Sequence, residues 1–140
     1  MPKNGPIIII EDDLEDRNMF TQAFRDAHVF NRLIFFDCGE GAFAFLKQNT
    51  EIPFLIFCDV NLPRQDGIHF KQQLENDIQI RAMCIPFIFY TSLDTEYAVN
   101  EAYRNTTVQG FFQKYNSYTE FKDVIRTIID YWKICRQPVH

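Results

Sequence analysis

The sequence predicts a doubly wound α/β fold, in which a five-stranded parallel sheet carries helices on both faces. Strand-like and helical patterns alternate five times along the 140 residues, as expected of parallel strands joined by right-handed crossovers. The stretches Ile7 to Ile10 and Phe54 to Cys58 are continuously apolar, which is typical of strands buried on both faces. Several strands end in charged or hydroxyl residues, and an open α/β sheet carries its chemistry at the carboxyl ends of its strands.

The first strand and the first helix are predicted from adjacent signals. Ile7 to Ile10 is entirely β-branched and therefore favours a central strand. Asp13 can cap the helix that follows, and Glu15 and Asp16 complement the positive end of its dipole. Apolar residues then recur at helical spacing: Phe20, Ala23, Phe24 and Ala27.

The second and third strand–helix pairs follow. Leu33 to Cys38 predicts a strand near an edge of the sheet, because it begins and ends in polar residues, and Ala42 to Asn49 predicts a helix. The apolar run Phe54 to Cys58 precedes a turn and a helix over Ile68 to Asn76. Glu75 to Pro86 has no clear periodicity and is expected to contain an irregular connection.

The last two pairs complete the sheet. Phe87 to Tyr90 is the fourth strand, and a helix capped by Asp94 is expected to run to about Arg104. Gly110 to Gln113 is a short fifth strand, after which Ser117 and Glu120 have capping-box spacing. The last helix carries the clearest apolar stripe in the chain, formed by Phe121, Val124, Ile125, Ile128 and Trp132.

Composition limits the possible classes of protein. Hydrophobic residues make up 46% of the chain and phenylalanine occurs 15 times, which excludes a disordered chain. A net charge of -5 argues against nucleic acid and anionic membrane as partners. The four cysteines are widely spaced and no run is long enough to span a membrane, so we expect a reduced, cytoplasmic protein without zinc or disulfides. One domain over residues 7–136, with tails at 1–6 and 137–140 and no effector domain, is expected.

Chemically capable side chains follow four of the strands. Glu11 and Asp12 follow the first strand, Asp59 the third, Thr91 the fourth and Lys114 the fifth. These ends share one edge of a doubly wound sheet, where three carboxylates would repel one another unless a cation lay between them. Oxygen ligands alone indicate a hard ion, Mg²⁺ or Mn²⁺. An ammonium and a hydroxyl nearby suit a phosphoryl group, with Asp59 as the nucleophile that forms an aspartyl phosphate.

Four segments carry a resemblance to a known family. They read Ile-Ile-Ile-Ile-Glu-Asp-Asp at 7–13, Cys-Asp-Val-Asn-Leu-Pro-Arg-Gln-Asp-Gly at 58–67, Tyr-Thr-Ser at 90–92 and Gly-Phe-Phe-Gln-Lys at 110–114. In these segments the chain resembles the receiver domains of response regulators, of the stand-alone type, and the likeness covers residues 7 to about 136. It implies the strand order 2-1-3-4-5.

The resemblance also implies a role for each matching residue. Asp59 is then the phosphoacceptor. Asp12 and Asp59 bind Mg²⁺ through their carboxylates, Glu11 through water and Asn61 through its backbone carbonyl. Lys114 pairs with the phosphoryl group.

The same resemblance implies a conformational switch. Thr91 hydrogen-bonds the phosphoryl group, and Phe111 turns into the space that Thr91 leaves, which remodels the face of the fourth helix, fifth strand and fifth helix. An ordinary core phenylalanine is the alternative interpretation of Phe111. Two positions depart from the family pattern: Tyr115 replaces the usual proline after the lysine, and apolar Leu93 predicts a long-lived phosphoryl group.

The sequence therefore predicts a signalling phosphoacceptor rather than an enzyme. A sensor histidine kinase or a histidine phosphotransfer protein would supply the phosphoryl group. A homodimer through the fourth-helix, fifth-strand and fifth-helix face is expected, because Ile129, Tyr131 and Cys135 lie beside the main stripe of the last helix. The alternatives are a receiver-like module that no longer accepts phosphate and, more remotely, a flavodoxin-like protein or an aspartate-nucleophile phosphatase.

Overall fold

The computed structural model describes residues 2–48, 50–62, 64–91, 96–114 and 117–138 and contains one five-stranded parallel sheet. The strand order is β2-β1-β3-β4-β5, so the predicted fold class and strand order are confirmed. The strands are β1 (Ile7–Ile10), β2 (Leu33–Phe36), β3 (Leu55–Asp59), β4 (Phe87–Thr91) and β5 (Gly110–Gln113).

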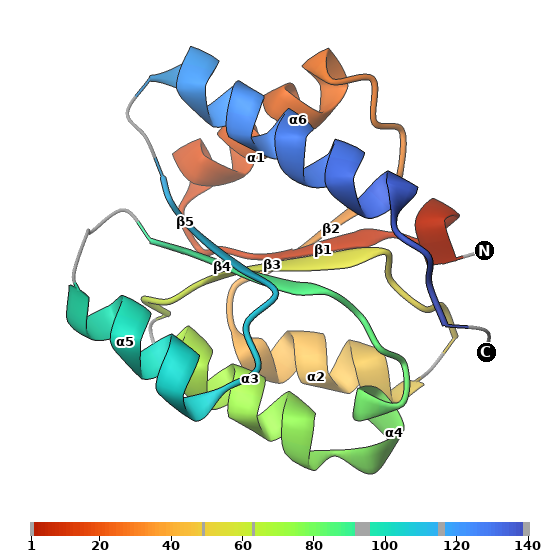
Figure 1. Ribbon diagram of the computed structural model, residues 1–140, viewed down its shortest axis with the longest axis vertical. Helices are drawn as coiled ribbons and strands as arrows, with labels where there is room; N and C mark the ends of the chain where they lie inside the picture. The colour runs from red at the N-terminus through yellow and green to blue at the C-terminus, as the bar shows by residue number, and fades with distance from the viewer. Residues whose placement is uncertain (1, 49, 63, 92–95, 115–116, 139–140) are drawn as a thin grey trace.

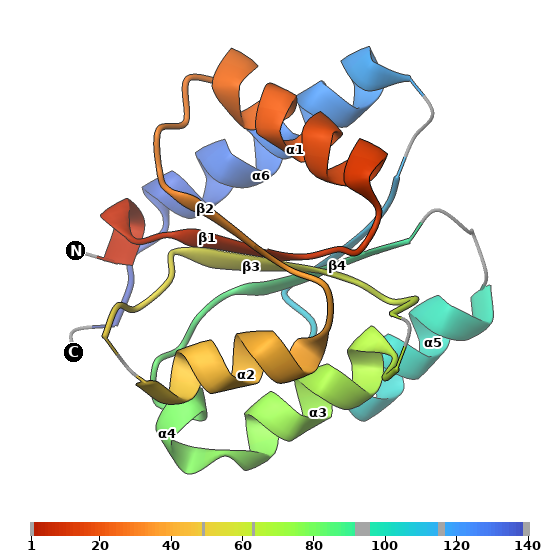
Figure 2. The same cartoon turned by 180° about the vertical axis from the view of Figure 1, so that it is seen from behind.

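Helices cover both faces of the sheet (Figures 1 and 2). One face carries α1 (Leu14–Asp26) and α6 (Tyr118–Ile134). The opposite face carries α2 (Gly39–Gln48), α3 (Gly67–Asn76), α4 (Ile78–Arg81) and α5 (Glu96–Asn105). This three-layer arrangement explains why β1 and the first four residues of β3, Leu55 to Cys58, are all apolar, since both faces of the sheet are covered.

Alternate residues of each central strand belong to different halves of the core. Ile8 and Ile10 of β1 pack in the cluster under α2 and α3, whereas Ile7 and Ile9 pack in the cluster under α1 and α6. All four isoleucine side chains are fully buried. Burying such a side chain stabilises the fold by roughly 1.5–3 kcal/mol, so this segment is a major contributor to the core.

Side-chain caps begin the helices where the sequence offers them. The Asp13 carboxylate accepts from Asp16 N at 3.0 Å at the start of α1, and the Ser117 hydroxyl accepts from Glu120 N at 3.5 Å at the start of α6. Asp66 caps α3 in the same way through His69 N. The predicted cap Asp94 lies outside the described residues, as do Leu93 and Tyr115.

The structure corrects several local predictions. The irregular region before β4 contains the short helix α4, which Asp77 caps, and α2 begins at Gly39 rather than Ala42. In α6 the predicted stripe is displaced: Ile129 is 1% exposed and belongs to the core, so it does not contribute to the outer apolar surface assigned to it. The apolar residues of this 17-residue helix are compatible with more than one rotation about its axis, so packing against the rest of the protein determines which of them are buried.

The amino-terminal segment contacts the end of the last helix. Residues Pro2–Asn4 form a single turn of 3₁₀ helix, η1, and Lys3 Nζ donates to the Lys133 carbonyl at 2.6 Å. No helix among the described residues is both long enough and apolar enough to cross a bilayer.

Candidate functional site

Four of the residues expected at the site lie at the carboxyl edge of the sheet, on the left of Figure 1. Asp59 and Thr91 are the last residues of β3 and β4, while Glu11 and Lys114 directly follow β1 and β5. Backbone hydrogen bonds continue past the strand ends, including Lys114 N to Thr91 O at 2.8 Å. All four residues are at least nine-tenths buried. Such burial is unusual for the charged side chains of Glu11, Asp59 and Lys114, and it indicates a functional site.

The Asp59 carboxylate is held by its own turn. Oδ1 of Asp59 accepts from Asn61 N at 2.9 Å, and the residue is 7% exposed. The pKa of Asp59 is raised to about 6, chiefly by burial. The nearby Glu11 charge contributes to this rise, and the hydrogen bond from Asn61 N opposes it. The group is therefore a poorly solvated carboxylate that ionises near neutral pH.

Gly67 lets the turn after β3 pack against Asp59. A Cβ atom at Gly67 would lie 2.6 Å from the Asp59 carbonyl oxygen and 3.0 Å from Cys58 Sγ. Gly67 N also donates to Val60 O at 2.8 Å, which closes the turn. The glycine is thus required by close backbone approach, and the turn fixes where the carboxylate sits.

Glu11 is the most deeply buried acid of the site, with 1% exposure. Its Oε1 accepts from the Tyr90 hydroxyl at 2.9 Å and from Lys114 Nζ at 3.2 Å, and its Oε2 accepts from Asp13 N at 3.1 Å. Burial raises the pKa of Glu11, and these three donors lower it in part. Glu11 is consequently a fixed acceptor that orients the lysine.

Lys114 reaches the acids of the β1–α1 segment. Its Nζ pairs with Glu11 at 3.2 Å and also with Asp16 in the first turn of α1. Burial favours the neutral amine, but the hydrogen bond to Asp16 and the charges of both acids prevail, so the pKa of Lys114 is raised. Lys114 therefore carries its charge into the site, where it also lowers the pKa of Asp59.

Two other expected residues differ in their surroundings. Asn61 is exposed, but its side-chain Nδ2 donates to Thr91 Oγ1 at 3.4 Å, which links the β3 and β4 ends of the site. Asp12 is solvent-exposed on the rim. The described residues contain no group of three Asp, Glu, His or Cys side chains arranged to hold a metal ion.

Phe111 is half-buried in β5, beside the core under α5. Its ring centroid lies 5.8 Å from that of Phe89, its register partner on β4. The phenylalanine expected to move is therefore neither a fully buried core residue nor a free surface residue.

Sequence reasoning missed two residues of the site. The sequence position of Asp16 predicts only an acid that complements the helix dipole and gives no sign of its contact with Lys114. The position of Tyr90 predicts only the end of an apolar strand, yet its hydroxyl donates to Glu11. The alternation of β4 could have indicated that Tyr90 shares the face of α1, but not which acid it would meet.

Comparison with known proteins identifies the family of the chain. The family model for the response regulator receiver domain matches residues 7–126. Two curated relatives are each 24% identical: the probable methanogenesis regulatory protein FilR2 of Methanothrix harundinacea, over 90% of this chain and 82% of its own, and the response regulator Rcp1 of Synechocystis, over 90% and 87%.

Solved structures share the fold. The Mn²⁺-bound form of Rcp1 superposes with a TM-score of 0.81 at 24% identity and covers 96% of this chain and 99% of its own. The phosphorylated cyanobacterial phytochrome response regulator RcpA gives a TM-score of 0.82 at 22% identity, covering 94% and 96%. With the family model spanning most of its length, this chain belongs to the response regulator receiver domain family of two-component signalling.

Proposed function

We propose that the chain accepts a phosphoryl group on Asp59 from a sensor histidine kinase or a histidine phosphotransfer protein. The observation that carries this proposal is the position of Asp59: a nearly buried carboxylate at a strand end, with a raised pKa and with Lys114 close enough to act on its charge. An Oδ atom of Asp59 attacks phosphorus while the donor's phosphorus–nitrogen bond breaks, and the departing imidazole takes a proton from solvent. The chain thus assists its own modification and is not proposed as an enzyme for other substrates.

The donor chemistry of the site suits a hard divalent cation, Mg²⁺ or Mn²⁺. The candidate ligands are the carboxylates of Asp12 and Asp59, Glu11 through water and the Asn61 carbonyl, all of them oxygen donors. Burial, with a smaller contribution from the Glu11 charge, raises the pKa of Asp59, and a cation bound beside these carboxylates would favour the ionised form. Bound there, the cation supplies charge neutralisation for phosphoryl transfer, and the Mn²⁺-bound form of Rcp1 provides a related example.

Lys114 and Thr91 are proposed to receive the transferred group. Lys114 exchanges its contacts with Glu11 and Asp16 for the phosphoryl oxygens, and the Thr91 hydroxyl donates to one of them. Movement of Thr91 frees space that the half-buried Phe111 can fill. The predicted fourth helix, fifth strand and fifth helix are α5, β5 and α6, because α4 is an additional short helix. Phosphorylation in this way biases the packing of the α5–β5–α6 face, on which output depends.

Intact mass spectrometry tests the proposal. The chain is incubated with a small phosphodonor, acetyl phosphate or phosphoramidate, with Mg²⁺ or with EDTA. We expect one phosphoryl group to be added only with Mg²⁺, none in Asp59→Asn, and a strong reduction in Lys114→Met. Asp66→Asn, which alters an acid that caps α3, is the matched control and should react like the wild type. Addition that persists in Asp59→Asn, or no addition at all, would favour the alternative of a phosphorylation-independent module.

A homodimer through the α5–β5–α6 face is proposed as the second element of function. β5 is an edge strand, and a groove of about 490 Å³ runs between it and α6, lined by Phe111, Phe112, Val124, Ile128 and Tyr131 among others. Large aromatic side chains are exposed on both helices of this face: Tyr97 and Tyr103 on α5 and Tyr131 on α6. Both signs of charge occur on these helices, which permits a self-complementary twofold interface.

Light scattering on the eluting protein tests this assembly. We expect a dimer, or a monomer that dimerises with a beryllofluoride phosphoryl mimic, and disruption by Tyr131→Asp. Glu15→Lys changes an exposed residue at the start of α1, outside the α5–β5–α6 face, and is the control. A monomer under both conditions at high protein concentration contradicts the proposal.

A further inference from the structure

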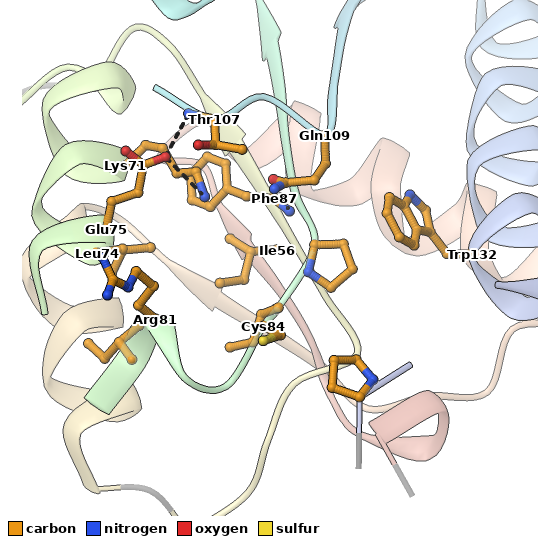
Figure 3. A pocket seen from close by; sticks show the side chains of 14 residues that line it. Ile56, Lys71, Leu74, Glu75, Arg81, Cys84, Phe87, Thr107, Gln109 and Trp132 are labelled. Atoms are coloured by element: carbon orange, nitrogen blue, oxygen red, sulfur yellow. Dashed lines mark hydrogen bonds and ion pairs between the residues drawn. The ribbon is translucent and has the colours of Figure 1, made fainter. Parts of the chain in front are cut away.

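A cavity of about 420 Å³ lies at the amino ends of β3 and β4, among α3, α4 and the start of β5 (Figure 3). Its walls are largely apolar and include Ile56, Leu74, Phe87 and Trp132. Phe87 begins β4, whereas Thr91 ends it, so the cavity and the phosphoacceptor edge are separated by four residues of strand, about 13 Å. The volume is in the range of small-molecule sites, roughly 300–1,000 Å³.

The unusual group in this cavity is Lys71. The residue is 7% exposed, and its ammonium lies 5.0 Å from the centroid of the Phe87 ring. Its ion-pair partner, Glu75 Oε1, is 3.8 Å away, which is too far for a hydrogen bond. That oxygen instead accepts from Thr107 N at 2.6 Å. Within the described ranges, no acceptor lies within hydrogen-bond distance of Lys71 Nζ, so a buried ammonium with three donors borders the cavity.

The charges of the cavity wall are unbalanced toward positive. Lys71, Glu75 and Arg81 are its charged residues. Arg81 is exposed, and no acid in the described part of the chain lies within ion-pair distance of its guanidinium. Since Glu75 offsets one cation, one positive charge remains without a partner beside an apolar surface.

We propose that this cavity binds a small organic anion that has a flat apolar body and a single carboxylate. The carboxylate accepts hydrogen bonds from Lys71 Nζ, with Arg81 adding long-range attraction, and the apolar body lies against Ile56, Leu74 and Phe87. The site is independent of the phosphoryl chemistry at Asp59.

Tryptophan fluorescence provides a direct test, because Trp132 is the only tryptophan in the chain and lines the cavity. The wild-type protein is titrated with 2-naphthoate and, separately, with the neutral 2-naphthamide, which has nearly the same shape. We expect saturable binding of the carboxylate with a Kd of about 1 mM or tighter, and binding of the amide at least about tenfold weaker.

Two variants separate Lys71 from other cations. Lys71→Met should bind both probes equally weakly, whereas Lys133→Met, which removes an exposed lysine next to the reporting tryptophan, should behave like the wild type. Thermal unfolding checks that each variant folds. Two results with the wild type would overturn the proposal: equal binding of the two probes, or no saturable binding of 2-naphthoate up to about 10 mM. The proposal would also be overturned if Lys71→Met still bound the carboxylate more tightly than the amide, as the wild type does.

Discussion

Replacing Asp59 by asparagine is expected to stabilise the fold at alkaline pH. Asparagine preserves the acceptor for Asn61 N but removes a carboxylate that lies near Glu11 and is 7% exposed. The pKa of Asp59 is raised to about 6 from an ordinary value of 3.8, so the folded state binds the proton more tightly than the unfolded chain. The stabilisation from this proton is complete below about pH 4 and is lost as the pH rises through about 6.

The magnitude follows from the size of the pKa change. With a difference of about two pKa units, ionisation of Asp59 lowers the free energy of unfolding by about 3 kcal/mol at pH 8. At pH 4.5 the same effect lowers it by only about 1 kcal/mol. Asp59→Asn should therefore raise the free energy of unfolding by about 2–3 kcal/mol at pH 8 and by much less at pH 4.5.

Urea unfolding followed by circular dichroism, in EDTA at both pH values, measures this difference. Asp12→Asn is the control, because Asp12 is exposed and its loss should change stability by no more than about 0.5 kcal/mol. Adding Mg²⁺ at pH 8 should stabilise the wild type and have little effect on Asp59→Asn. A destabilised Asp59→Asn at pH 8, or a gain of equal size at both pH values, would refute the reasoning that burial and the Glu11 charge strain the ionised carboxylate.

Three further predictions concern Gly67, Tyr90 and Leu93. Gly67→Ala should lower the free energy of unfolding by about 1–3 kcal/mol, because its Cβ would lie 2.6 Å from the Asp59 carbonyl oxygen. Gly110→Ala is the control: the nearest atoms to its Cβ lie at 3.5 Å, so the free energy of unfolding should change by less than about 1 kcal/mol. Urea unfolding measures both variants. Tyr90→Phe removes a donor to the buried Glu11 and should cost about 1–3 kcal/mol at pH 7 by the same measurement; no loss would mean that the hydroxyl does not support the acid. From the sequence alone, Leu93→Glu should accelerate loss of the phosphoryl group by offering a polar group to a hydrolytic water, and an unchanged decay of the phosphorylated species by mass spectrometry would contradict this.

Much of the candidate site could be predicted because parallel strands bring their carboxyl ends to one edge. Once Ile7–Ile10 and Leu55–Asp59 are recognised as strands, Glu11 and Asp59 must be neighbours in space. The side-chain partners could not be predicted in this way. Lys114 is long and flexible, and the choice of Glu11 and Asp16 as its partners depends on where α1 lies over the sheet.

Helix faces show the same division. The spacing of the apolar residues in α6 predicts a helix, but these residues cover so wide a face that several rotations about the helix axis would bury a similar number of them. Packing against α1 selected Phe121, Ile125 and Ile129 for the core and left Val124 and Ile128 half-buried beside the groove.

Local sequence patterns suffice to predict the alternation of strands and helices, the capping of α1 and α6 and the acids at the strand ends. These features follow from short-range pattern and from connection rules that hold for any parallel sheet. Three-dimensional packing is needed to establish the burial of Asp59, the pairing of Lys114 with Asp16 and the cavity around Lys71. Each of these depends on distances between segments far apart in the chain, and such distances are set by packing rather than by local residue preference.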